Sequence, residues 1–183
     1  MHDVQPAVAT TAPMTKRISP GERFEDPLTW EADAAAGPHI WRTLGYRRTE
    51  WQRGSTTIEW TALPEYCFPT ADGLVVQGGL VTALLDVAMG GACWTMLDND
   101  QVFLTADLRV EFLRVSRPGL LSATGTVVRR TRRVVFCAAE IRDAEGAVLA
   151  ASRCTQVVLP NAGPYGRRGA ADRSGAPPED ARG

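Results

Sequence analysis

The most prominent feature of the hydropathy pattern is an apolar segment of about twenty residues, from Gln77 to Leu97. Its one charge is Asp86, and glycine pairs stand at its start and in its second half. A continuous apolar run of this length is too long for a strand and predicts a helix. Because apolar residues occupy every face, other parts of the chain have to cover most of the helix surface.

Strand patterns lie on both sides of this helix. Residues 46–63 predict two strands with a turn near Arg53-Gly54, and Pro64 ends the second one. A loop, residues 64–76, then leads to the helix. Residues 101–115 show the clearest strand pattern, because apolar side chains recur at every second position, namely at Val102, Leu104, Ala106, Leu108, Val110 and Phe112.

Three more predicted strands follow, at residues 120–130, 133–143 and 147–159, with short turns between them. The turn after residue 116 contains Pro118, and the last turn contains Gly146, which suits a positive φ. One antiparallel sheet that curls around the helix would cover it on most sides. We therefore expect an α+β hotdog fold, an antiparallel sheet wrapped around one long central helix.

The two ends of the chain have the composition of disordered segments. Residues 1–25 are rich in Pro, Thr and Ala, residues 161–183 are rich in Gly, Pro, Arg and Ala, and neither shows a hydrophobic period. Residues 27–46 predict one or two short helices, interrupted at Gly37-Pro38. We expect one hotdog domain over residues 26–160, with a disordered tail on each side.

Composition narrows the class of protein only slightly. The chain of 183 residues is 44% apolar and 22% charged, as in globular proteins. A formal net charge of −1 gives no general attraction to nucleic acid or to anionic membranes. A signal peptide and a membrane span of ~20 apolar residues are not recognisable, so we expect a cytoplasmic protein. The cysteines form no CxxC pair and are expected to be reduced core residues; they are Cys67, Cys93, Cys137 and Cys154.

Asp86 is the anomaly of the apolar helix. Burying an ionised carboxylate without partners is costly, so the residue needs either a compensating contact or a task. One interpretation places Asp86 on an exposed strip of the helix or against a nearby loop. The other makes it a general base or a nucleophile in a pocket.

Gly78 and Gly79 stand at the expected helix start, where backbone N–H groups have no intrahelical partner and the helix dipole is positive. Such an end can stabilise a carbonyl oxygen that becomes negative during a reaction, although two glycines can also simply form a tight turn. Gly78 and Asp86 are ~12 Å apart along one helix, too far to act on one reacting group. If both act, they come from two subunits whose helices run antiparallel in a two-fold dimer.

These features together resemble one known family. The stretch VQGGLVTALLDVAMG, followed by LTADLRVEFLRVSRPG and a closing pair of strands, is similar to the hotdog-fold acyl-CoA thioesterases of the PaaI type over roughly residues 55–159. The family pattern is an HGG-type turn, an acid nine residues after its first position, and a strand with a small hydroxyl residue. The matching positions are Gln77, Gly78, Gly79, Asp86 and Thr105.

The resemblance implies hydrolysis of an acyl-CoA thioester with neither a metal nor an organic cofactor. It implies that the N–H of Gly78 polarises the carbonyl, that Asp86 activates water or attacks directly, and that Thr105 helps to place the water. Gly79 is expected to contact the substrate. Gln77 replaces the usual histidine; it can hydrogen-bond a carbonyl or water but cannot titrate near neutrality. Ala71 stands where the family often has asparagine, and Asp72, one residue on, is the candidate substitute.

A basic cluster, RRTRR, stands at a predicted turn between two strands. It is either a solvated hairpin tip or, as the resemblance implies, a site for the phosphates of coenzyme A. Nucleic-acid binding is not favoured, because no aromatic residues alternate with the arginines. The candidate phosphate ligands are Arg129, Arg130, Arg132 and Arg133, with Arg114 and Arg117 as further candidates.

Two other functions remain open from the sequence. A non-catalytic acyl-CoA-binding protein on the same fold fits the missing histidine, whereas Asp86 favours an enzyme. A hotdog hydratase or dehydratase is disfavoured because both histidines precede the motif. We expect a homodimer or homotetramer, and we expect Trp94 and Met96 to be core or dimer contacts. The acyl group is not determined.

Overall fold

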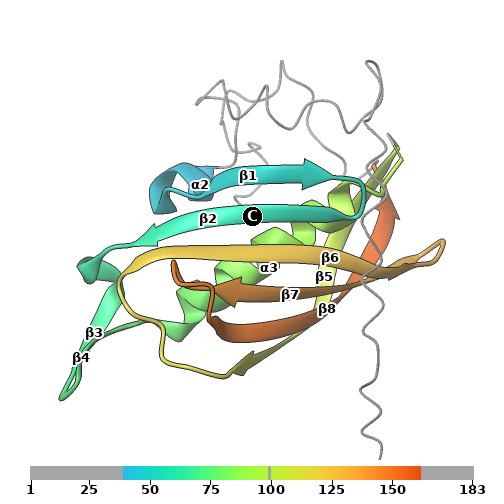
Figure 1. Ribbon diagram of the computed structural model, residues 1–183. Helices are drawn as coiled ribbons and strands as arrows, with labels where there is room; N and C mark the ends of the chain where they lie inside the picture. The colour runs from blue at the N-terminus through green and yellow to red at the C-terminus, as the bar shows by residue number, and fades with distance from the viewer. Residues whose placement is uncertain (1–38, 99, 162–183) are drawn as a thin grey trace, which may run out of the picture.

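A computed structural model describes residues 39–98 and 100–161 of the chain (Figure 1). The predicted N-terminal tail and residues 162–183 of the C-terminal tail lie outside the described residues, as does the first helical segment expected before Gly37. The second is present as α2. The elements are α2 His39–Leu44, β1 Arg47–Gln52, β2 Ser55–Ala62, the 3-10 helix η2 Pro64–Tyr66, β3 Cys67–Thr70, β4 Gly73–Val76, α3 Gly78–Trp94, β5 Gln101–Phe112, β6 Gly119–Arg130, β7 Val134–Arg142 and β8 Val148–Pro160.

Six strands form one antiparallel sheet in the order β1-β2-β6-β7-β8-β5. The sheet curves around α3, which crosses behind it in Figure 1. This arrangement is the hotdog fold, so the fold expected from the sequence is confirmed. The segment expected as a loop before α3 contains a separate two-stranded hairpin, β3-β4. At its turn, Gly73 adopts a φ of 106° and its carbonyl accepts a hydrogen bond from Thr70 Oγ1.

A glycine on β6 lets α3 lie directly on the sheet. A Cβ atom at Gly125 would be 2.3 Å from the backbone carbonyl carbon and oxygen of Ala88. The same carbonyl accepts a hydrogen bond of 2.8 Å from the buried Thr56 Oγ1 on β2. This close contact buries one side of α3, including Leu84, Leu85, Ala88 and Met89, and fixes which side is left for Asp86.

Strand β5 departs from the alternation that the sequence predicts. A register shift between Thr105 and Asp107 inserts one extra residue opposite β8, which exchanges the faces of the strand. Leu104 was expected to face the core and is 46% exposed, whereas Phe112, beyond the bulge, faces α3 at Gly78 although it is 56% exposed. Before the bulge the odd-numbered side chains face α3, so Phe103 packs edge-on against Trp94 with ring centroids 6.3 Å apart.

The free cysteines largely fulfil the expectation of reduced core residues. Cys93, Cys137 and Cys154 are buried, whereas Cys67 is partly exposed. Within the described ranges, no helix has the length and hydropathy needed to cross a membrane.

Candidate active site

Asp86 lies half-buried on the side of α3 that faces β5. Thr105 Oγ1 donates a hydrogen bond of 3.1 Å to Asp86 Oδ1. Burial raises the pKa of the Asp86 carboxyl, and the hydrogen bond from Thr105 lowers it by a smaller amount. The β5 bulge begins directly after Thr105, so the threonine still belongs to the part of the strand whose odd-numbered residues face the helix. The structure thus brings together two residues 19 positions apart that the sequence singled out.

Asp86 is at the wall of a largely apolar cavity of about 300 Å³. Three parts of the chain form it: the middle of α3, strand β5, and the segment from α2 to β1. The lining residues are Trp41, Arg48, Trp51, Asp86, Val87, Gly90, Gly91, Trp94 and Phe103. A carboxylate beside an apolar hollow of this size suits a reaction on a group whose apolar part is held in the hollow.

The helix start, 8 residues before Asp86, has its own geometry. Gln77 is the N-cap of α3, and its Oε1 accepts a hydrogen bond of 2.9 Å from Leu80 N. A Cβ atom at Gly79 would be 2.7 Å from that oxygen, so Gly79 leaves room for the cap. The N–H groups of Gly78 and Gly79 make no hydrogen bond to any described residue, as expected in the first helical turn.

A second cavity, of about 500 Å³, contains Gly78 and not Asp86. Phe112 and Leu113 of the β5 end form part of its wall, and Phe112 lies directly over Gly78. No residue lines both cavities. Within one chain, the acid and the helix start therefore belong to separate hollows, as their spacing along the helix requires.

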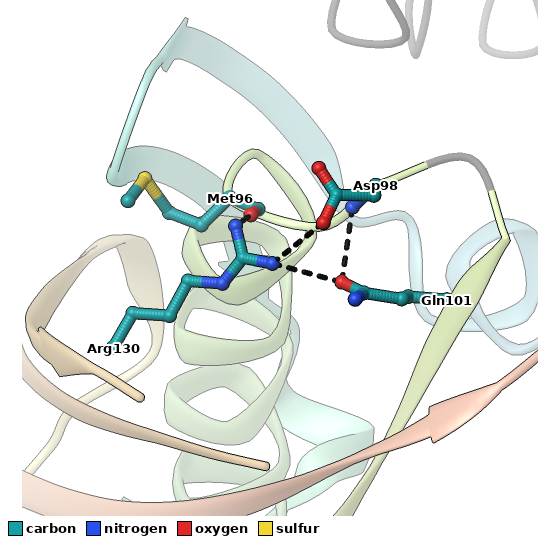
Figure 2. A network of polar contacts seen from close by, with 4 residues as sticks. All are labelled: Met96, Asp98, Gln101 and Arg130. Carbon is teal, nitrogen blue, oxygen red and sulfur yellow. Dashed lines mark hydrogen bonds and ion pairs between the residues drawn. The ribbon is translucent and has the colours of Figure 1, made fainter. Parts of the chain in front are cut away.

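The predicted basic cluster divides into two parts. Arg130 closes the C-terminal end of α3: Nη1 donates to the Met96 carbonyl, and Nη2 donates to Asp98 Oδ2 and Gln101 Oε1, each at 2.9 Å (Figure 2). This network gives Arg130 a structural role that the sequence did not predict. Arg129, Arg132 and Arg133 are exposed and stay candidates for phosphate binding.

The other expected ligands lie at the surface. Asp72 is in the exposed turn of the β3-β4 hairpin, and among the described residues no hydrogen bond joins it to Gln77 or Asp86. Arg117 is exposed, and its Nη1 donates to the Leu74 carbonyl, which fastens the same hairpin to the sheet. Arg114 lines the cavity that contains Gly78.

The sequence did not identify most of the residues around Asp86. Trp41, Arg48 and Trp51 come from a segment that precedes the family motif, and Phe103 was assigned to the outer face of its strand. Trp94 was expected to be a core or dimer contact; it packs against the core and also lines the cavity. The tryptophans before and within the motif were a possible sign of an apolar pocket, but the sequence alone does not show that they lie together.

Comparison with known proteins gives one family and a consistent fold. Residues 75–150 match the sequence model of the thioesterase superfamily. A candidate esterase of Saccharolobus solfataricus is 28% identical over 125 residues, which covers 67% of this chain and 86% of that protein. These matches confirm the resemblance recognised in the motifs and support a thioesterase activity.

Solved structures show the same fold at low sequence identity. A thioesterase from Haemophilus influenzae superposes with a TM-score of 0.66 at 18% identity, over 75% of this chain and 94% of its own. A thioesterase family protein from Silicibacter pomeroyi gives 0.63 at 21%, over 70% and 95%. The Escherichia coli PaaI protein from the phenylacetic acid degradation operon gives 0.62 at 18%, over 71% and 92%.

Proposed function

We propose that this hotdog-fold protein, which matches the thioesterase superfamily over residues 75–150, hydrolyses an acyl-CoA thioester to a free acid and coenzyme A. The observation that carries the proposal is the placement of Asp86. It is half-buried at an apolar cavity, is oriented by the Thr105 hydroxyl, and has a pKa that burial raises toward the range of a useful base.

The chemistry requires two groups on one carbonyl carbon. Asp86 removes a proton from a water molecule that attacks the thioester carbon, or the carboxylate attacks that carbon itself and water then hydrolyses the anhydride. In either route the carbonyl oxygen becomes negative and accepts a hydrogen bond from the N–H of Gly78. The carbon–sulfur bond breaks as the tetrahedral intermediate collapses, and coenzyme A leaves as the thiolate.

The two groups meet when a second copy of the chain is added. Strand β5 is an edge strand, and exposed edges are usually covered. Thr105 contacts Asp86, and Phe112 lies over Gly78. A two-fold axis that relates Gly78 of one chain to Asp86 of the other therefore crosses β5 midway between Thr105 and Phe112.

An axis at this point makes the edge self-complementary. The midpoint of these two positions falls between Leu108 and Arg109, so the centre of β5 lies against the centre of β5 in the second copy. In this dimer the exposed Phe112 side chain lies near Thr105 of the second copy and becomes buried in the interface. We infer a homodimer with two active sites, and a homotetramer is a pair of such dimers.

The apolar cavity is assigned to the acyl group. Coenzyme A then extends toward the surface, where Arg129, Arg132 and Arg133 are the candidate phosphate ligands; Gly79 and Asp72 are candidates for contacts nearer the thioester. The reaction needs neither a metal nor an organic cofactor. The cytoplasmic location expected from the sequence stays a prediction.

The test is thiol release from a panel of aliphatic and aromatic acyl-CoAs, followed with a thiol reagent. Asp86→Asn is expected to lower turnover by about 10²- to 10⁴-fold, the contribution of a general base, while the fold is retained. Glu140→Gln removes an exposed carboxylate on β7 and serves as the matched control with unchanged turnover. No release by the wild type, together with thermal stabilisation by coenzyme A, would instead identify a non-catalytic binding protein.

A further inference from the structure

A fully buried glutamine lies on β8, the strand that pairs with β5. Gln156 on β8 is 0% exposed, and neither Oε1 nor Nε2 of its side chain has a hydrogen-bond partner among the described residues. A buried amide without a hydrogen bond destabilises a fold, whereas an apolar side chain of similar size does not. Besides its contact with the Cys154 thiol, which lowers the pKa of that thiol, the amide keeps hydrogen-bonding capacity that a water molecule can use.

Gln156 shares a face of the sheet with the residue that orients the catalytic acid. It is the direct cross-strand partner of Thr105 in the β5-β8 pair, and residues directly opposite each other point to the same face. Thr105 Oγ1 donates to Asp86, so this is the face that packs on α3. Gln156 Nε2 lies 4.0 Å from the position that a Cβ would take at Gly90.

Gly90 relates the amide to the carboxylate. It follows Asp86 by four residues and so lies on the same side of α3, ~6 Å further along the axis. Two hydrogen bonds to one water molecule join atoms that are roughly 4.5 to 5.5 Å apart. A Cβ at Gly90 would be 3.2 Å from the Phe103 ring, so the missing side chain lets the ring and the Gln156 amide both approach the helix here.

Few titratable groups face Asp86 from the elements packed around it. From β1, Arg48 lines the same cavity. The other groups are thiols: burial raises the pKa of Cys93 on α3 to about 12, and the hydrogen bond that Cys137 on β7 donates to Cys154 raises the pKa of Cys137. That hydrogen bond lowers the pKa of Cys154 on β8, while burial and the charge of Asp86 raise it. A neutral amide that steadies the ionised acid without adding charge suits these surroundings.

We propose that Gln156 is a positioning residue for Asp86: its Nε2 donates to a buried water, which in turn donates to the carboxylate. Two hydrogen bonds then hold the Asp86 carboxylate: Thr105 donates to Oδ1, and the water donates to the same carboxylate from the side of β8. The inference rests on the proposed function, because it assigns Gln156 a role in the activity of Asp86.

The test is Gln156→Met, which keeps the length of the side chain and removes both polar atoms. We expect kcat to fall with little change in KM, and the acid limb of the kcat/KM profile to move at least about 0.5 pH unit toward neutrality, because the ionised carboxylate loses a donor. The melting temperature should change little, because a side chain of similar length keeps the packing. An unchanged kcat and an unmoved acid limb would overturn the proposal.

The matched control is Ser152→Ala on the same face of β8. Ser152 is also buried and polar, but its Oγ donates to the Arg109 carbonyl and not toward Asp86. This variant should melt at a lower temperature and keep the wild-type acid limb. An equal shift of the limb in both variants would mean that general loosening of β8 causes it, and the proposal would be wrong.

A measurement on the wild type keeps the test independent of folding and of activity. A crystal structure at a resolution that reveals ordered water should show one molecule within hydrogen-bond distance of both Gln156 Nε2 and an Asp86 carboxylate oxygen. A well-resolved structure with no water molecule between Gln156 and Asp86 would contradict the proposal. If the wild type releases no thiol from any acyl-CoA, the proposed function fails, and the crystallographic result still decides whether Gln156 supports Asp86 through water.

Discussion

Mixed dimers give the sharpest test of a site shared between two chains. One chain carries Asp86→Asn, and the other carries Gly78→Pro. In the mixed dimer one site combines both substitutions, whereas the other site combines an intact Asp86 with an intact Gly78. If the groups act across the interface, the purified mixed dimer should have about half the activity of the wild-type dimer, because one of two sites is complete.

The structure allows Gly78→Pro to remove the N–H without removing the helix. Gly78 is the first residue of α3, a position that favours proline, and the preceding Gln77 has an extended conformation with φ −62° and ψ 123°. The added Cβ meets only the end of the Phe112 ring, at 3.3 Å, and that side chain is 56% exposed and can move. Loss of the donor should lower turnover by about 10²- to 10³-fold in the homodimer.

The assay uses two affinity tags, sequential purification of co-expressed chains, and thiol release from the best acyl-CoA of the panel. Each homodimeric variant is the baseline, and a mixed dimer of tagged wild-type chains sets the full scale. A mixed dimer as inactive as both parents would refute the reasoning, since it would mean that Asp86 and Gly78 act within one chain.

Three further outcomes test the fold and the charges around the site. Burial raises the pKa of Asp86 in the folded state above its unfolded value, so the ionised group opposes folding at neutral pH, and this effect disappears as the pH falls. Asp86→Asn should therefore raise the melting temperature at pH 7. In calorimetry the difference between variant and wild type should shrink toward about pH 4. Gly125→Ala should destabilise the protein by at least about 2 kcal/mol in urea unfolding, because the new methyl group overlaps the Ala88 backbone at 2.3 Å. Arg130→Met should lower the free energy of unfolding by about 1–2 kcal/mol, because the Met96 carbonyl loses its hydrogen-bond donor. KM for acyl-CoA should change less than about twofold, since the guanidinium binds the end of the helix and not the substrate.

The elements that the sequence predicted well are those with strong and regular hydrophobic patterns. The apolar run after Gln77 became α3, and the four segments after it became β5 to β8. The β3-β4 hairpin was missed because Pro69 lies inside it and its four-residue strands are too short to show alternation. The pairs β1-β2, β6-β7 and β7-β8 join neighbours in the chain, whereas β2-β6 and β5-β8 were not predicted because these strands are distant in the chain.

The bulge in β5 shows why a pattern can locate a strand and still misplace its faces. Alternating apolar residues assigned Leu104 to the core, yet one extra residue at the bulge means that odd-numbered residues face α3 before it and even-numbered ones after it. Thr105, which the family motif and not the alternation singled out, lies beside Asp86. Phe103, which the pattern put outside, forms the cavity wall. Nothing in the spacing of apolar residues reveals a bulge, so this part of the site required the structure.

Gln77 shows how the structure changes the meaning of a departure from the family pattern. A glutamine in place of the usual histidine first suggests a lost group near the reacting carbonyl. In the structure its Oε1 caps Leu80 N, so the acceptor half of the amide is used by the helix and Nε2 remains as a donor beside Gly78. This donor is neutral at every pH, unlike an imidazole. The replacement therefore removes a titrating group rather than a hydrogen bond, and Asp86 alone should set the acid limb of the activity profile.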